Sequence, residues 1–295
     1  AATDPPALSV KLWGLTLPNP IGIAAGFDKD AEAYAGLLRA GAGFVEVGTV
    51  TPRPQAGNPR PRLFRLPADG AVINRMGFNN RGMAAMAQRL AGRDRSAGIV
   101  GVNIGRNKDG DDSDYKTCFK ILAPLADYIT VNVSSPNTSG LRESQGRDAL
   151  SALIESLQEV RTRLGLTLPL LVKIAPDLTH EQRQDIADVA LSSGLDGLVI
   201  SNTTIARADT LQSRARSEKG GLSGRPLMAP STALLAEMHQ LTEAKLPLIG
   251  TGGIASAADA RAKIAAGATL VQLYTALAYR GPRLIREIKR GLATA

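Results

Sequence analysis

Polar side chains recur where the predicted β-strands of this chain end. All but one of them carry amides, hydroxyls or lysine ammonium groups. The residues are Asp28, Lys29, Thr49, Asn103, Asn132, Ser134, Ser135, Asn137, Thr138, Lys173, Ser201, Asn202, Thr203, Tyr274 and Thr275. Amides donate and accept hydrogen bonds, so they suit the C=O and N–H groups of an uncharged heterocycle, and lysines suit an anionic group on it. A metal site would need clustered carboxylates or imidazoles, and His180 and His239 are far apart, so no metal is expected.

Glycine clusters accompany the last predicted strands. They are Gly220-Gly-Leu-Ser-Gly224 and Thr251-Gly-Gly253, and Tyr274-Thr275 follows the final strand. Glycine lets backbone N–H groups approach phosphate oxygens closely, and a helix N-terminus adds a favourable dipole. Each cluster alone is typical of an ordinary turn. Together, after the strands where barrels usually bind phosphate, they predict a phosphate site.

The elements that must position these groups repeat along the chain. Eight short β-rich runs, each followed by a helical stretch, span 21–27, 44–50, 99–105, 128–134, 169–176, 197–204, 247–254 and 270–276. Their apolar residues are consecutive, which suits parallel strands covered on both faces. The pattern predicts an α/β fold, a (β/α)₈ TIM barrel, whose catalytic groups lie at the carboxyl ends of the strands.

Three segments fall outside this repeat. Residues 8–20 predict an N-terminal hairpin that covers the barrel floor, 52–78 form a Pro- and Arg-rich insertion with two extended pieces, and 205–227 form a Gly-rich insertion. The length of 295 residues exceeds a typical barrel of roughly 250 by too little for a second full domain. We therefore expect one domain over residues 1–295.

The composition limits the partners. The net charge of +8 favours anionic partners, and eight arginines stand against one acid between residues 47 and 93. No aromatic interleaving or nucleic-acid motif accompanies them, so a solvated or membrane-facing surface is favoured over nucleic-acid binding. No run of 18 apolar residues occurs, which predicts no transmembrane helix. The single cysteine, Cys118, shares a helical stripe with apolar residues and is interpreted as a core residue.

Seven motifs in order resemble one family. They are Ala24-Ala-Gly-Phe-Asp-Lys29, Asn74-Arg-Met-Gly-Phe78, Gly101-Val-Asn-Ile-Gly105, Asn132-Val-Ser-Ser-Pro-Asn-Thr138, Lys173-Ile-Ala-Pro-Asp177, Ser201-Asn-Thr-Thr204 and Gly220-Gly-Leu-Ser-Gly224. From about residue 8 to its end, the chain resembles dihydroorotate dehydrogenases. The resemblance implies an FMN enzyme that oxidises dihydroorotate to orotate in pyrimidine synthesis.

The resemblance also implies the subclass and the chemistry. The soluble class of the family has a cysteine base in the catalytic loop and the quinone-using class has a serine, and here the loop reads Ser134-Ser135-Pro136. By resemblance, Ser135 removes the C5 proton of dihydroorotate while C6 passes hydride to the flavin. Thr138 is a candidate to orient Ser135 or relay its proton. Lys173 resembles the lysine beside the flavin ring, where a positive charge would stabilise the reduced form.

Further binding residues follow from the same resemblance. The implied substrate contacts are Lys29, Asn74, Arg75, Met76, Gly77, Phe78, Asn132, Asn137, Asn202 and Thr203. The implied FMN contacts are Ala25, Gly26, Lys29, Thr49, Asn103, Asn132, Lys173, Ser201, Gly224, Gly253, Tyr274 and Thr275.

One feature departs from the family pattern. The quinone-using class normally carries two N-terminal amphipathic helices that dock on the membrane, whereas this chain begins beside the hairpin. The resemblance implies a peripheral membrane protein that faces the cytoplasm or matrix. We expect the chain as given to be soluble, and its ability to reduce a quinone is in doubt. Two alternatives stay open: an FMN-barrel dehydrogenase with a water-soluble acceptor such as fumarate, and a non-catalytic phosphate- or nucleotide-binding barrel.

Overall fold

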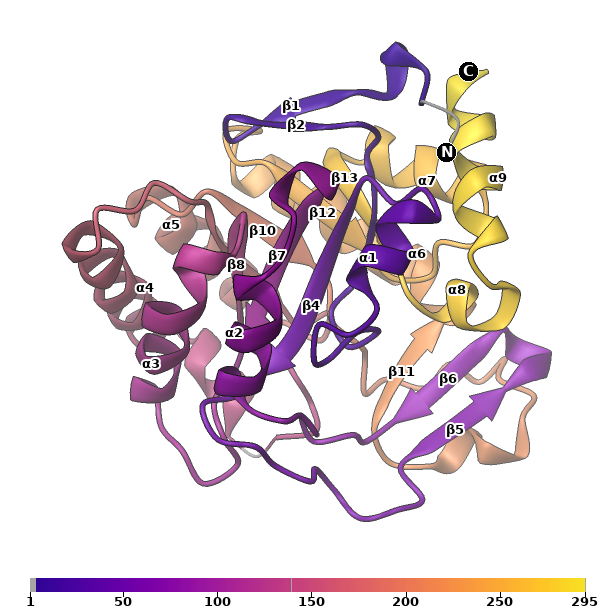
Figure 1. The fold of residues 1–295 in the computed structure, drawn as a ribbon. Coiled ribbons are helices and arrows are strands. Elements are labelled where there is room, and N and C mark those ends of the chain that lie inside the picture. Colours follow the sequence, from indigo (N-terminus) through magenta and orange to yellow (C-terminus); the bar gives the residue numbers. More distant parts are fainter. Residues whose placement is uncertain (1–3, 139, 295) are drawn as a thin grey trace.

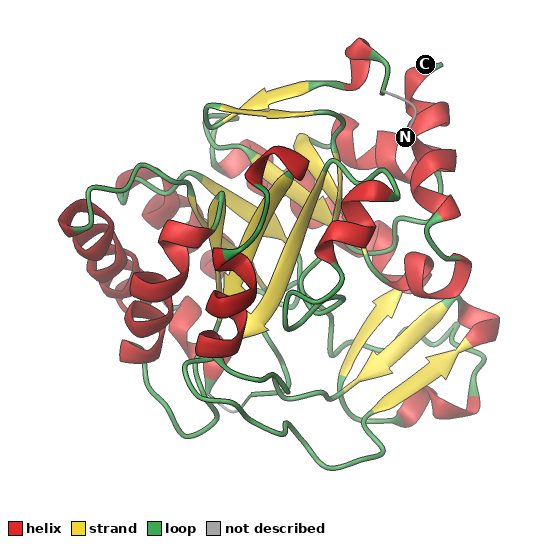
Figure 2. Ribbon diagram, in the orientation of Figure 1, coloured by secondary structure: helices red, strands yellow, loops and turns green. Residues whose placement is uncertain are grey.

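The computed structural model describes residues 4–138 and 140–294. Eight parallel strands close into a barrel in the order β10-β12-β13-β3-β4-β7-β8-β9, with helices around it (Figure 2). The strands are β3 (Ile21–Ile23), β4 (Phe44–Val50), β7 (Ile99–Ile104), β8 (Tyr128–Asn132), β9 (Leu170–Ile174), β10 (Gly197–Ile200), β12 (Leu248–Thr251) and β13 (Ala268–Leu273). Each corresponds to a predicted β-rich run, so the (β/α)₈ barrel is confirmed. Most strands end before their run does, which leaves its polar residues in loops.

The barrel interior is filled by large residues opposite glycines. A Cβ atom on Gly22 would lie 2.3 Å from the Phe44 ring, and one on Gly101 would lie 2.0 Å from the Tyr128 ring. Both aromatic rings are buried. Only glycine therefore fits at these two positions, and the amino-terminal half of the barrel is a packed core rather than a channel.

Helices cover the outer face of the barrel. They are α1 (Tyr34–Arg39), α2 (Met83–Ala91), α3 (Ser113–Leu122), α4 (Arg147–Arg163), α5 (His180–Ser192), α6 (Met228–Leu241), α7 (Ala257–Ala265), α8 (Thr275–Arg280) and α9 (Arg283–Ala293). Their apolar faces join the strands in one large buried cluster. Cys118 of α3 is buried within it, as expected for a core residue, and burial raises the pKa of its thiol. None of the helices in the described residues has the length and hydropathy needed to span a bilayer.

The predicted hairpin is present and lies at the end of the barrel where the strands begin (Figure 1). Strands β1 (Val10–Leu12) and β2 (Leu15–Leu17) are joined by Trp13 and Gly14, with φ angles of 54° and 73°. Two consecutive positive φ angles are typical of a type I′ turn. The Trp13 indole donates to the carbonyl of Asp196 at 2.8 Å, and its ring centroid lies 6.0 Å from that of Tyr128. The hairpin thus closes the floor and leaves the opposite end for a site.

A separate three-stranded antiparallel sheet lies beyond the carboxyl ends of the barrel strands (Figure 1). It contains β5 (Leu63–Leu66), β6 (Ala71–Asn74) and β11 (Gly221–Gly224), in the order β11-β6-β5. The first two strands come from the 52–78 insertion and the third comes from the 205–227 insertion. Asp69 also joins the insertions, because its carboxylate accepts from the backbone N–H groups of Gln212 and Ser213 at 2.8 and 3.1 Å. The sequence predicted extended pieces in the first insertion but not this pairing.

The arginines of residues 47–93 are spread over several ion pairs. Arg93 has a buried side chain 2.6 Å from the Asp127 carboxylate, whereas the Arg53–Asp109 pair is exposed. An exposed pair contributes little to stability, since water and salt screen it. The arginine run therefore has mixed roles, and part of it holds loops to the barrel.

Candidate active site

A cavity of about 410 Å³ lies at the carboxyl ends of the barrel strands. Its volume is in the range of small-molecule sites. Most of the residues that the sequence implied line this cavity: Ala25, Gly26, Lys29, Thr49, Asn74, Met76, Gly77, Phe78, Asn132, Ser135, Asn137, Lys173, Ser201, Asn202, Thr203, Gly224, Gly253, Tyr274 and Thr275. Asn74 and Gly224 reach it from the three-stranded sheet, so the two insertions complete a site that the barrel begins.

Three implied residues lie elsewhere. Asn103 is buried beneath the cavity, where its side chain contacts Thr49. Thr138 is buried in the loop after β8. Arg75 points away from the cavity, because its guanidinium pairs with Glu218 at 2.8 Å and stacks 4.6 Å from the Phe64 ring centroid. The roles implied for these residues stay predictions.

The asparagines of the site are oriented by one another. Asn202 Nδ2 donates to Ser134 Oγ at 3.0 Å and to Asn132 Oδ1 at 3.3 Å. Asn137 Nδ2 donates to Asn74 Oδ1 at 3.3 Å, joining the loop after β8 to the outer sheet. An amide held by its neighbours presents a fixed donor or acceptor to a ligand, which is how a polar ring is recognised with little reorganisation.

The two serines of the loop after β8 have different surroundings. Ser134 has no exposed surface, and its hydroxyl donates to Asn132 Oδ1 at 3.1 Å. Ser135 lines the cavity, and its Oγ accepts from the backbone N–H of Asn137 at 3.3 Å. A hydroxyl that reacts with a ligand must reach the cavity, so the geometry favours Ser135.

Arg142 stabilises the loop after β8 through hydrogen bonds, a role that was not anticipated from the sequence. It belongs to the short 3₁₀ helix η5 (Leu141–Gln145), and its Nε donates to the carbonyl of Ser134 at 3.2 Å. A second nitrogen donates to the carbonyl of Thr203 at 3.2 Å, and a third pairs with Asp177 at 2.9 Å. Asp177 ends one of the seven motifs, but nothing local in the sequence indicates that it pairs with Arg142.

Two lysines bring positive charge to the cavity. Lys173 is buried on β9, and burial lowers its pKa while the nearby Glu46 carboxylate opposes that change. Burial lowers the pKa of Lys29 to about 8, with a further contribution from Arg62 and an opposing one from Asp30. Both pKa values are lowered because a low-dielectric surrounding disfavours the ammonium form. An anionic ligand would reverse this effect.

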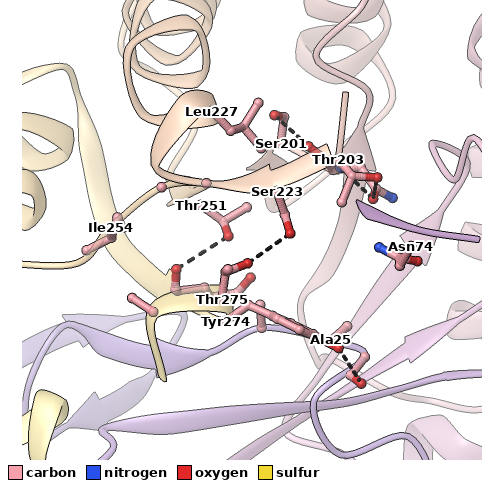
Figure 3. A pocket seen from close by; sticks show the side chains of 18 of the residues that line it. Ala25, Asn74, Ser201, Thr203, Ser223, Leu227, Thr251, Ile254, Tyr274 and Thr275 are labelled. Carbon is pink, nitrogen blue, oxygen red and sulfur yellow. Dashed lines mark hydrogen bonds between the residues drawn. The ribbon is translucent and has the colours of Figure 1, made fainter. Parts of the chain in front are cut away.

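Three glycines form a cradle at one end of the cavity. Gly224, Gly252 and Gly253 have φ angles of 95°, 105° and 81°. A Cβ atom on Gly253 would lie 2.5 Å from backbone atoms of Met228, where α6 begins. The hydroxyl of Thr275 donates to that of Ser223 at 2.9 Å. Figure 3 shows these two side chains pointing toward one another. The donors and the close backbone approach fit a phosphate group.

Gln272 of β13 adds a feature that the sequence did not suggest. Its Oε1 atom is buried without a hydrogen-bond partner among the described residues, although the residue lines the cavity. A buried acceptor without a donor is costly, so this atom fits a cofactor that brings an N–H or O–H group. Further lining residues that were not predicted include Pro67 and Ala68 between β5 and β6, Leu227 just before α6, and Tyr279 and Arg280 of α8.

The fold and the cavity define a (β/α)₈ barrel with a polar cavity and a glycine-lined cradle whose shape fits a phosphate group. A family model described as dihydroorotate dehydrogenase matches residues 7–295. A protein of Rhodospirillum rubrum named dihydroorotate dehydrogenase (quinone) is 56% identical over 296 residues, which cover 99% of this chain and 80% of that protein. One of the same name from Parvibaculum lavamentivorans is 56% identical over 294 residues, covering 99% of this chain and 84% of that protein.

Solved structures agree with the family match. The ligand-free DHODH of Eimeria tenella is 45% identical, with a TM-score of 0.96 that covers 100% of this chain and 89% of that one. Its complex with ferulenol gives a TM-score of 0.95 at 45% identity, over 99% of this chain and 85% of that one. The chain belongs to the dihydroorotate dehydrogenase family. The family expected from the seven motifs, and the quinone-dependent class expected from the serine at position 135, are thereby confirmed.

Proposed function

We propose that this chain oxidises (S)-dihydroorotate to orotate with FMN as its resident cofactor and passes the electrons to a quinone. The single observation that carries the proposal is one cavity holding an amide-rich end, a buried lysine and a glycine cradle. The quinone named for the bacterial relatives supports the acceptor. On the same basis we propose a peripheral association with a membrane, and a single FMN-binding domain that includes both insertions.

FMN fits the residues present. Gly224, Gly253 and Thr275 would hold its phosphate, and Lys173 would lie beside its ring. When bound, the flavin supplies the hydride acceptor and the electron carrier that no amino-acid side chain provides. A positive charge on Lys173 favours electron density added beside it. The unpaired Oε1 of Gln272 would gain a donor.

The reaction divides between two carbons of the substrate. The C5–H bond breaks with its proton going to Ser135, and the C6–H bond breaks with its hydrogen and electron pair leaving as hydride, so a C5=C6 double bond forms. A serine hydroxyl is a poor base, so its own proton must leave as it accepts the substrate proton. Thr138 is proposed to orient Ser135 or to relay its proton to water. The amides of Asn74, Asn132, Asn137 and Asn202 would hold the pyrimidine, with Lys29 near its carboxylate.

Purified protein tests the proposal directly. We expect about one FMN per chain on release and chromatography, and bleaching of the yellow colour when dihydroorotate is added without oxygen. Re-oxidation by a short-chain quinone faster than by fumarate would support the quinone. Finding FAD, or no flavin after reconstitution, would contradict FMN as the cofactor. A flavin that stays oxidised when dihydroorotate is added would contradict the dehydrogenase activity and favour a non-catalytic phosphate-binding barrel.

A further inference from the structure

Glu46 is a carboxylate buried inside the barrel, below the cavity. It lies on β4 with no exposed surface. Asn103 Nδ2 donates to its Oε1 at 2.8 Å, and Gln272 Nε2 donates to its Oε2 at 2.8 Å. The hydroxyls of Tyr128 and Thr130 lie 3.1 and 3.2 Å from the same Oε2 atom. Both oxygens of this buried carboxyl group therefore have hydrogen-bond partners, as a buried polar group requires.

The carboxylate determines how Asn103 is oriented. A side-chain amide has a donor end and an acceptor end, so an Nδ2 that faces Glu46 turns Oδ1 to the other side. That Oδ1 accepts from the hydroxyl of Thr49 at 2.5 Å and from Asn132 Nδ2 at 3.3 Å. The direction of the first hydrogen bond thus fixes the direction of the second.

The same logic continues to the cavity wall. Asn132 uses its Nδ2 toward Asn103 and toward Thr49 Oγ1, at 3.3 and 2.9 Å. Its Oδ1 therefore faces outward, where it accepts from the hydroxyl of Ser134 and from Asn202 Nδ2. Glu46, Asn103, Asn132 and Asn202 form one directed chain, which we call the amide chain. It ends on two residues that line the cavity and on the serine next to Ser135.

We propose that Glu46 is a positioning residue that sets the donor and acceptor directions of the amide chain and thereby which hydrogen bonds the cavity offers to the pyrimidine ring. It touches neither substrate nor cofactor and acts through Asn103 and Asn132. The inference rests on the proposed function, because it assumes that the amides read the pyrimidine.

Exchanging the carboxylate and the amide between positions 46 and 103 tests whether Glu46 orients the amide chain. Glu46→Gln keeps the side-chain shape but can place its N–H₂ group against the N–H₂ group of Asn103. Two donors then face each other, and the first hydrogen bond of the amide chain is lost. Asn103→Asp puts two carboxylates in contact. When both substitutions are combined, the new amide at position 46 can donate to the new carboxylate at position 103, whose second oxygen still accepts from Thr49 and Asn132. The three variants differ from the parent only in nitrogen, oxygen and proton positions.

The readout is orotate affinity of the FMN-loaded protein, followed by the change in flavin absorbance. We expect each single variant to lose roughly 10- to 100-fold, since a buried polar group is left unsatisfied, and the double variant to recover most of that loss. Glu181→Gln, which removes an exposed carboxylate from α5, is the matched control and should bind as the parent does. Two results would overturn the proposal: a Glu46→Gln variant that binds orotate with the parental affinity, or a double variant whose affinity is no higher than that of the single variant that binds orotate more weakly.

A parent protein that binds no orotate would contradict the proposed function instead. In that case the midpoints of thermal unfolding of the ligand-free proteins still test the coupling between positions 46 and 103. Destabilised single variants with a restored double variant would support the directed contact between Glu46 and Asn103. Additive effects would refute it.

Discussion

The Nζ atom of Lys263 donates a hydrogen bond to the Oγ atom of Ser231 at 2.5 Å, and neither residue has exposed surface. Ser231 Oγ lies 2.6 Å from the carbonyl of Leu227 and 3.2 Å from that of Gly252. The contact therefore ties α7 and α6 to the glycine cradle. Burial lowers the pKa of Lys263 to about 7, against an opposing contribution from Asp259.

This buried lysine should make stability depend on pH. Its pKa is about 7 in the folded protein and 10.5 as the reference value, so between these values the unfolded chain binds more protons. The free energy of unfolding should then rise with pH across this window, by at most about 1.4 kcal/mol per pH unit. Lys263→Met removes the titrating group. Urea unfolding of parent and variant at pH 6.5, 8 and 9.5 should give curves that diverge, whereas parallel curves would contradict the assignment.

Lys29 should make orotate binding depend on pH. Its pKa is about 8, so the ammonium form that attracts a carboxylate predominates below pH 8 and is lost above it. Orotate affinity should be nearly constant from pH 6 to 7.5 and then fall by up to tenfold per pH unit, because the complex favours protonated Lys29. Titrations of flavin absorbance measure this. Lys29→Met should bind orotate more weakly, and its affinity should not fall above pH 8. If the parent and the variant have the same pH profile, Lys29 is not the group that binds the carboxylate.

Gly253 should be needed for the cofactor rather than for the fold. An alanine there would have φ near 81° and a Cβ atom 2.5 Å from Met228, so the cradle must shift. We expect Gly253→Ala to weaken FMN binding at least tenfold while circular dichroism stays unchanged. Gly165→Ala is the matched control, because its φ is 62° and nothing lies within 4 Å of the added Cβ. Equal FMN affinities for the two variants would argue against the cradle.

The barrel was predictable because its signals are local. Apolar runs such as 169–176 are strands over most of their length, and the polar residues that close them lie in loops around one cavity. The hairpin was predictable for the same reason, since Trp13-Gly14 separates two short extended segments.

The remaining features depend on contacts between distant residues. Gly221 pairs with Asn74 across the outer sheet, and no periodicity in either insertion specifies that register. Glu46 appears in the sequence as an acid within an apolar strand, and its meaning depends on donors from three other strands. Arg142 and Asp177 are 35 residues apart, and ordinary surface ion pairs have the same residue types. Sequence patterns report burial and turns, whereas these features depend on tertiary position.

The two serines of the loop after β8 allow a sharp test of the proposed mechanism. Ser134→Ala removes a hydroxyl that bridges Asn132 and Asn202, so we expect it mainly to weaken orotate binding. Ser135→Ala removes the hydroxyl that lines the cavity while leaving the amide chain intact. It should keep FMN and orotate but slow flavin reduction by dihydroorotate by roughly 10² to 10⁴, the usual contribution of a positioned general base.

Replacement of Ser135 by cysteine separates loss of a base from loss of packing. A thiol ionises near pKa 8.5, so Ser135→Cys should exceed Ser135→Ala in the rate of flavin reduction, with the advantage growing as pH rises through that value. Stopped-flow mixing with dihydroorotate under anaerobic conditions measures the reduction step apart from re-oxidation. If flavin reduction is slow in Ser134→Ala and not in Ser135→Ala, the base is Ser134. If both alanine variants reduce their flavin at the parental rate, proton removal by this loop is wrong.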